Sequence, residues 1–251
     1  MIRDDTQHMK DVAREIRRDQ VISAKVIRLC NSAYFGVKMP IDSIDRALVI
    51  LGEKRLLQLV VSASMEEFFP DTEHGYSLCK GGLYNHAIGT AMICEKLARL
   101  TERVSPDIAY TAGLLHDIGK VVLDQYMAPA YPLFYRRTQL DGDNLISVEK
   151  EVLGITHPEA GYKLAQRWSL PQSLIDTILF HHQPEKATAN PDLTHLVYLA
   201  DLVMSRFILG QELERVNTDD LVSRLRKVGL KPEQFPIVID SIPQELLNTC
   251  R

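Results

Sequence analysis

The sequence has little of what marks a membrane, secreted or thiolate-bound metal protein. Its apolar runs are short and broken by charges, as in LLQLVVSASM, and none approaches the roughly 20 apolar residues of a membrane-spanning helix. The N-terminus, MIRDDTQHMKD, is charged at once, which argues against a secretory signal. The four cysteines lie far apart without a CxxC pair, so neither a zinc–thiolate site nor a thiol-exchange site is expected. We therefore expect a cytoplasmic protein with reduced cysteines.

Basic residues are not in excess either. The 251 residues include 29 Lys and Arg against 33 Asp and Glu, a net charge of -4, which does not fit a broad phosphate-binding surface. The segment ALVILGEKRLLQL loosely has the spacing of a helix-turn-helix, but it is too apolar to present a recognition face. We expect neither a nucleic acid nor a membrane as a partner.

Strand-like alternation is nearly absent, whereas apolar residues recur at three and four positions in many windows, which predicts an all-α fold. The periodicity lapses in FFPDTEHGYS, where Pro, Asp and Gly gather. We therefore predict an N-terminal helical lobe over 1–68, a helical core with the candidate site over 69–212, and a C-terminal helical extension over 213–251. The short first lobe is expected to pack on the core.

The predicted helices are Thr6–Arg18, Val21–Asn31, Ser43–Leu51, Glu53–Phe68, Cys79–Thr101, Ser105–Tyr126, Ala128–Leu140, Leu145–Leu153, Pro158–Trp168, Pro171–Phe180, Leu193–Leu209, Thr218–Val228 and Lys231–Asn248.

Two acidic residues, Asp201 and Asp117, lie inside or at the end of apolar segments. Asp201, in LVYLADLVM, has apolar neighbours on nearly every side, so its carboxylate is expected to face the interior. No basic residue lies three or four positions away, so its partner must come from another element. His116 and Asp117 end the apolar run of AGLLHDIGK, and Lys120 follows three positions later. The alternative for the doublet is a helix that turns toward water.

The remaining histidines of interest also border apolar segments. His157 lies in THPE, whose Thr and Glu have capping-box spacing, so it is expected near a helix N-terminus that favours neutral imidazole. His181 and His182 close a helix just before a proline, and His86 lies on an amphipathic helix among apolar or small neighbours. The alternatives are a surface histidine at 157, cations at a helix C-terminus at 181 and 182, and a satisfied core histidine at 86.

A divalent cation accounts for all of these residues together. Imidazole and carboxylate ligands without thiolate favour iron or manganese, with zinc, nickel or magnesium as alternatives. We expect Asp117 to bridge two ions and Lys120 to meet a phosphate oxygen. The predicted metal ligands are His86, His116, Asp117, His157, His181, His182 and Asp201.

This set resembles the HD superfamily of metal-dependent phosphohydrolases. His86, the His116–Asp117 doublet and Asp201 match its histidine, HD pair and final aspartate in order and in helical context. The additional histidines are similar to the ligands of the HD-GYP branch, whose binuclear centres hydrolyse cyclic di-GMP, and Lys120 matches the lysine of that branch. No GYP element follows the histidine pair in HHQPEKATANPD, which departs from that pattern.

A second resemblance covers about Asp19 to Asp201. The segments KVIRLCNSAYFG, SIDRALVILGEKRLLQLV, GLLHDIGK, HPEAGYKLAQRWSLP and HH are together similar to the HDOD family, the HD-related output domains of bacterial signalling. The resemblance implies an HD-superfamily helical bundle in two packed lobes that works with a receiver or other sensor domain. Many members lack the metal ligands and are treated as non-catalytic, whereas this chain has a nearly full set. The chain opens in what resembles the family's second helix, so an upstream segment is expected.

Two functions follow as hypotheses. In the first, the chain is a signal-transduction output domain whose NSAYFG turn or inter-lobe groove engages a protein partner, and the metal is structural. In the second, it is a metal-dependent phosphohydrolase that acts on a nucleotide or cyclic dinucleotide, with Asp117 and Lys120 as catalytic residues. Metal content does not separate the two, whereas turnover does.

Overall fold

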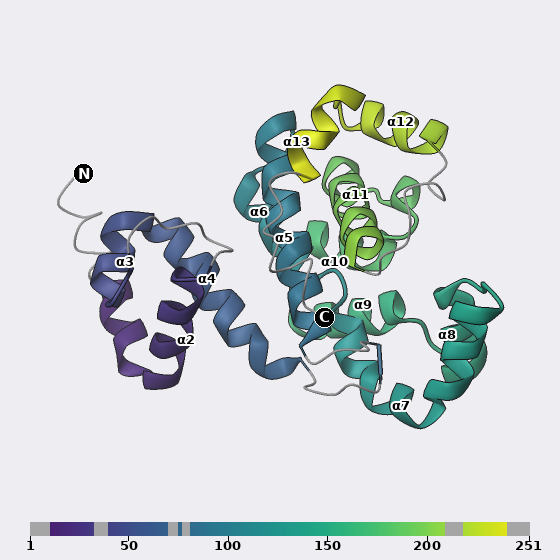
Figure 1. Ribbon diagram of the computed structural model, residues 1–251, viewed down its shortest axis with the longest axis horizontal. Coiled ribbons are helices and arrows are strands. Elements are labelled where there is room, and N and C mark those ends of the chain that lie inside the picture. The colour runs from purple at the N-terminus through teal and green to yellow at the C-terminus, as the bar shows by residue number, and fades with distance from the viewer. Residues whose placement is uncertain (1–10, 33–39, 70–74, 77–80, 209–217, 240–251) are drawn as a thin grey trace. The chain divides into compact units, whose positions relative to one another are not determined.

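Helices are the regular elements of the part of the chain that the structure describes (Figure 1). The computed structural model describes residues 11–32, 40–69, 75–76, 81–208 and 218–239, and no strand occurs among them. The all-α prediction is confirmed. The chain divides into two compact units, Met1–Phe68 and Phe69–Arg251. None of the described helices combines the length and apolar character that crossing a bilayer requires.

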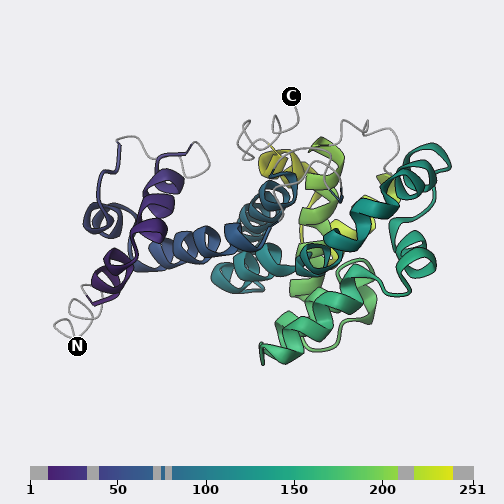
Figure 2. The same ribbon diagram turned by 90° about the horizontal axis from the view of Figure 1, so that it is seen from below.

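The first unit is a small helical cluster, purple to blue in Figures 1 and 2. Residues 11–18 are helical, and Asp19 then caps the next helix by accepting hydrogen bonds from two backbone N–H groups. Fully buried side chains such as Val26, Leu56 and Leu59 form its core, where burial of each stabilises the fold by about 1.5–3 kcal/mol. The remaining elements of this unit are α2 Gln20–Cys30, α3 Ile44–Leu51, α4 Glu53–Met65 and the 3-10 turn η2 Glu66–Phe68.

Only the start of the NSAYFG segment is described. The Asn31 side chain donates to the carbonyl oxygen of Ile41 and accepts from its backbone N–H, at 2.6 and 2.7 Å. This amide therefore joins the end of α2 to the segment that leads into α3. The other four residues of the proposed partner-binding turn lie outside the described residues.

The second unit contains the candidate site. Its helices are α5 Gly82–Thr101, α6 Pro106–Leu115, α7 Ile118–Tyr135, α8 Leu145–Leu153, α9 His157–Arg167, α10 Gln172–Phe180, α11 Pro191–Ile208, α12 Thr218–Lys227 and α13 Phe235–Ile239, with short turns η3 Arg136–Leu140, η4 Pro184–Lys186 and η6 Pro232–Gln234. The α11 helix packs against α5 and α6 (Figure 1) through fully buried leucines such as Leu193, Leu196 and Leu199. These leucines lie on the same helix as Asp201, so the apolar packing of α11 places that carboxylate inside the unit.

Three predicted helices differ from those observed. The predicted helix Lys231–Asn248 begins as the 3-10 turn η6 and becomes α-helical from Phe235, and its last part, 240–248, lies outside the described residues. The predicted helix Ser105–Tyr126 is wrong, because the chain breaks at the His116–Asp117 doublet between α6 and α7. Conversely, α7 continues through Pro129 and Pro132, where a new helix was predicted to begin at Ala128. Prolines three residues apart leave their missing donors on one side of the helix, so the hydrogen bonds on the other side persist.

Two glycines allow helices that carry site residues to approach closely. A Cβ at Gly113 would lie 2.7 Å from Cα of Ala91, so α6 rests directly on α5, the helix of His86. A Cβ at Gly119 would collide with the carbonyl oxygen of His157 and lie 2.7 Å from the backbone nitrogen of Gly161. The first turn of α7 therefore touches the first turn of α9, which brings His157 next to the doublet.

Candidate metal centre

The seven predicted ligand residues converge in the second unit around Asp117. Its Oδ2 atom lies 3.5 Å from Nε2 of His86 and 3.3 Å from Nε2 of His116. Its Oδ1 atom lies 3.3 Å from Nε2 of His157 and 3.5 Å from Nε2 of His181. The two oxygens of one buried carboxylate thus face two different sets of imidazoles.

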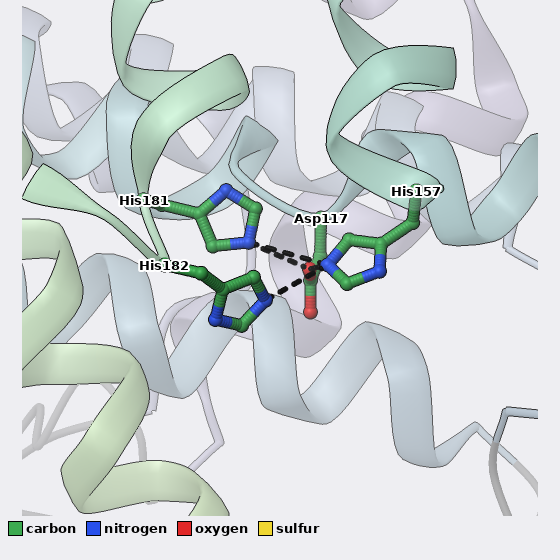
Figure 3. A group of neighbouring side chains, drawn as sticks. All are labelled: Asp117, His157, His181 and His182. Carbon is green, nitrogen blue, oxygen red and sulfur yellow. Dashed lines mark hydrogen bonds and ion pairs between the residues drawn. The ribbon is translucent and has the colours of Figure 1, made fainter. Parts of the chain in front are cut away.

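The first set, here the His157 group, consists of Asp117, His157, His181 and His182, whose potential ligand atoms all lie within 4.8 Å of one another. His157 is the first residue of α9, and the other two histidines directly follow α10. Figure 3 shows the three rings pointing toward one another and toward Asp117. The Nε2 atom of His157 lies 3.3 Å from that of His181 and 3.0 Å from that of His182.

The second set, here the His86 group, consists of His86, His116, Asp117 and Asp201, again with potential ligand atoms within 4.8 Å. The Oδ1 atom of Asp201 lies 3.1 Å from Nε2 of His86 and 3.8 Å from Nε2 of His116. The hydroxyl of Ser205, one turn further along α11, donates to the same oxygen at 3.0 Å. The sequence predicted that Asp201 has partners on other elements. These partners are His86 on α5 and His116 between α6 and α7.

Hydrogen bonds at Nδ1 determine which nitrogen of three histidines faces the centre. His116 donates to the carbonyl oxygen of Gly113 at 2.7 Å, and His181 donates to that of Ile178 at 2.8 Å. His157 contacts the Glu149 carboxylate at 2.8 Å. Since these oxygens can only accept from a ring nitrogen, each Nδ1 carries hydrogen. Nε2 is therefore the nitrogen that faces the centre, and it presents a lone pair there once it carries no proton.

These lone pairs fit a cation. When His157 and His181 carry hydrogen only at Nδ1, their Nε2 atoms are both acceptors and cannot hydrogen-bond to each other across their 3.3 Å separation. Within the described residues, Nε2 of His86, Nε2 of His116 and Oδ1 of Asp117 are buried without a hydrogen-bond partner. Unpartnered buried polar atoms are costly, and a bound divalent ion would satisfy them once it has displaced any proton on Nε2.

Charges within the centre hold its carboxylates ionised. Burial raises the pKa of Asp117, but the positive charges of His116 and Lys120 lower it well below its usual range. Burial likewise raises the pKa of Asp201, and the neighbouring imidazoles of His116 and His86 lower it well below that range. Burial lowers the pKa of His116, but the carboxylates of Asp117 and Asp201 raise it to about 10.

The imidazoles of the His157 group behave differently. Burial lowers the pKa of His157 well below its usual value, and the positive charge of Lys120 lowers it further. Burial and the neighbouring His181 also lower the pKa of His182 well below that value. Both rings are therefore neutral at pH 7, the protonation state that metal binding requires.

Lys120 lies on the first turn of α7 and contacts the centre directly. Its Nζ atom donates to Oδ2 of Asp117 at 2.5 Å, and its side chain is 13% exposed. Burial lowers the pKa of the ammonium, but the Asp117 carboxylate raises it above its usual value. Lys120 is thus a charged group at the edge of the centre, where it reaches both Asp117 and solvent.

The sequence did not indicate three residues that surround His157. The Glu149 side chain is fully buried and contacts the imidazole. Tyr76 donates to Glu149 through its hydroxyl and to Asp124 through its backbone N–H. The segment LISVEKEVL has three charged residues in close succession, so its pattern does not distinguish a buried Glu149 from its exposed neighbours. Of the histidines left without a function, His195 donates to the carbonyl oxygen of Pro191, while those at positions 8 and 74 lie outside the described residues.

A helical bundle with a buried histidine and aspartate centre is the class of protein that this fold and site define. The family model for the HDOD domain matches residues 1–184, and the chain therefore belongs to the HDOD family. An uncharacterised protein of Treponema pallidum (strain Nichols) is 28% identical over 209 residues, which cover 81% of this chain and 39% of that protein. The chain spans less than two thirds of the length of the first curated relatives it matches.

Solved structures agree with this assignment. An HDOD domain protein of unknown function from Geobacter sulfurreducens has a TM-score of 0.76 at 25% identity, covering 95% of this chain and 84% of that chain. A proposed phosphohydrolase from Shewanella amazonensis SB2B has a TM-score of 0.74 at 26% identity, covering 96% of this chain and 87% of that chain. The helical HDOD fold is therefore shown for nearly the whole chain.

Proposed function

We propose that this chain is an HDOD-type signal-transduction output domain that holds two divalent ions, one in each group. The observation that carries the proposal is the position of Asp117, whose two oxygens face different sets of imidazoles. A carboxylate in this position could be a ligand in both groups at once. The nitrogen and oxygen donors favour iron or manganese, with zinc, nickel or magnesium as alternatives.

The signalling role rests on membership of the HDOD family. Its proposed partners are an upstream sensor or receiver domain and a downstream signalling protein. A nucleotide or cyclic dinucleotide is the proposed small-molecule ligand. We propose no nucleic acid or membrane partner, in line with the acidic net charge of -4.

A second candidate, a metal-dependent phosphohydrolase, is favoured by uneven exposure around the centre. The side chains of His116, His157 and His181 are 0% exposed, whereas those of His182 and His86 are 33% and 15% exposed. The two partly exposed histidines bring the centre within reach of a substrate from solvent. The similarity of the fold to that of the proposed phosphohydrolase from Shewanella amazonensis also supports this candidate.

In this second candidate the residues of the chain take distinct roles. Ions held by the two groups would supply Lewis acidity and a nucleophile derived from water. Asp117 keeps the two groups together, and its charge holds the Lys120 ammonium beside the centre. There Lys120 donates a hydrogen bond to a phosphoryl oxygen and stabilises the charge that develops on it.

Elemental analysis of protein purified without added metal tests the metal proposal, which expects two ions per chain. His157→Gln should reduce the metal content, whereas His195→Gln, a matched change at a buried histidine outside both groups, should leave it unchanged. Turnover of bis(p-nitrophenyl) phosphate, cyclic dinucleotides and nucleotides with added Mn²⁺ or Fe²⁺ then separates the two candidates. Metal without turnover favours the output domain, turnover favours the hydrolase, and the absence of metal in every preparation contradicts both.

A further inference from the structure

Glu149 is a fully buried carboxylate that no motif of the sequence marks. It lies on α8 and accepts hydrogen bonds from the backbone N–H of His157 at 2.8 Å and from Nδ1 of the same residue at 2.8 and 2.9 Å. The hydroxyl of Tyr76 donates to it at 2.8 Å. Every partner is a donor, so both oxygens act as acceptors, and the ring and the backbone of His157 are held by one group.

This contact distinguishes His157 from the other histidines whose Nδ1 is fixed. His116 and His181 donate to backbone carbonyl oxygens within their own turns of chain, of Gly113 and Ile178 respectively. A carboxylate at Nδ1 stabilises positive character on the ring and makes Nε2 a stronger electron donor than a carbonyl does. Among these three histidines, His157 is therefore the one whose donor strength depends on a charged neighbour.

Tyr76 contacts Glu149 directly, and Asp124 fixes the backbone of Tyr76. The backbone N–H of Tyr76 donates to Oδ1 of Asp124 at 2.9 Å, and the Tyr76 ring stands edge-on to His157 with centroids 6.3 Å apart. A Cβ at Gly75 would lie 2.8 Å from Cγ of Asp124, so this backbone lies directly against α7. The Tyr76 hydroxyl is thereby directed at Glu149, and the carboxylate cannot rotate without losing one of its donors.

We propose that Glu149 is a positioning residue that tunes metal affinity in the His157 group, with Tyr76 holding its carboxylate in place. Glu149 fixes His157 as the Nδ1–H tautomer and directs its Nε2 at the ion, which Glu149 itself does not touch. The inference rests on the proposed function, because it assigns a role to Glu149 only if the His157 group binds metal. Loss of such a hydrogen bond typically weakens metal binding about 10- to 100-fold.

The test compares Glu149→Ala, Glu149→Gln and the control Glu95→Gln by Mn²⁺ titration of the metal-free full chain, followed by electron paramagnetic resonance. Glu95 is a buried carboxylate outside both groups, and its side chain accepts from Arg99. The same variants are also made with His86→Gln, which leaves only the His157 group with all its residues. In both backgrounds we expect Glu149→Ala to weaken the His157-group ion about 10- to 100-fold, and Glu95→Gln to change it less than about twofold.

Glu149→Gln provides the rescue. Its amide oxygen can still accept from both nitrogens of His157, while its amide nitrogen donates to the hydroxyl of Tyr76. We therefore expect it to restore part of the affinity that Glu149→Ala loses, and it remains informative if the alanine variant does not fold.

The spectroscopic readout is the tautomer of His157 in metal-free protein, from ¹⁵N correlation spectra of the imidazoles. We expect the Nδ1–H form in wild type and in Glu149→Gln, and a tautomer mixture in Glu149→Ala. If wild type binds Mn²⁺ but Glu149→Ala keeps both the affinity and the tautomer, the positioning role is overturned. If wild type binds no ion, the proposed function fails instead, and the tautomer spectra still report whether Glu149 orients the ring.

Discussion

Metal binding in the His86 group should release a proton from His116. Burial lowers the pKa of this imidazole, but Asp117 and Asp201 raise it to about 10, so the metal-free ring is protonated at pH 7. An ion that coordinates Nε2 must displace that proton. The His157 group differs, because the pKa values of His157 and His182 are lowered well below their usual range and both rings are already neutral.

The size of the effect follows from the pKa of His116. Each pH unit below a pKa costs about 1.36 kcal/mol when the proton must be removed. From a pKa of about 10, binding at pH 7 therefore costs about 4 kcal/mol, or roughly a thousandfold in affinity. The metal affinity of the His86 group should therefore increase with pH, about tenfold per pH unit, and level off near pH 10. Affinity in the His157 group should change little above pH 7.

Calorimetric titration with Mn²⁺ between pH 6.5 and 8.5, in buffers of different ionisation enthalpy, measures this release directly. We expect two binding steps, a tighter one without proton release and a weaker one that releases about one proton per chain. His195→Gln should behave as wild type, since this buried histidine lies outside both groups. A weaker step whose affinity and heat depend on neither pH nor buffer would refute the reasoning.

Three other perturbations test the same structure. Asp117→Asn keeps the size of the side chain but removes the charge that both groups share, so elemental analysis should find less than one ion per chain; two retained ions would exclude Asp117 as the bridge. Gly119→Ala should force α7 and α9 apart and lower the free energy of unfolding by about 1–3 kcal/mol or more in urea, while unchanged stability would mean that the close contact is absent. Leu196→Ala should lower that free energy by about 2–5 kcal/mol through a cavity beneath α11 without changing the number of bound ions, and a lost ion would show that the centre depends on remote packing.

Local patterns predicted the capped and apolar features of the fold well. The THPE spacing predicted a capping box, and the structure has both of its hydrogen bonds, between Thr156 and Glu159 at the start of α9. The apolar surroundings of Asp201 predicted a buried carboxylate with partners on other elements, and the structure supplies His86 and His116. These predictions succeed because caps and helical periodicity depend on residues a few positions apart.

The features that the sequence did not predict depend on distant contacts. The helix break at the doublet lies between Gly113, which rests against Ala91 of α5, and Gly119, which rests against His157 of α9, and no window of the sequence reveals these two contacts. Glu149 contacts Tyr76, which is 73 positions away, so its burial was not evident from the pattern of α8. Glu149 and Glu151 are similar in sequence, but only Glu149 has hydrogen-bond donors in the interior, which allow its carboxylate to be buried.

The charges of the centre also bear on whether a metal would be needed for folding. Lys120 and the protonated His116 offset Asp117 and Asp201, and Glu149 accepts from three donors. The buried carboxylates are therefore compensated without an ion, unlike those of a site that folds only around its metal. We expect chelator-treated protein to keep its helical circular dichroism at pH 7 and to lose thermal stability only by mass action, about 2.7 kcal/mol at a metal concentration of 100 times Kd. A protein that folds without its ions does not need them as a scaffold, so a full ligand set favours a role for the metal in binding or turnover. Unfolding on chelation would instead favour a structural metal.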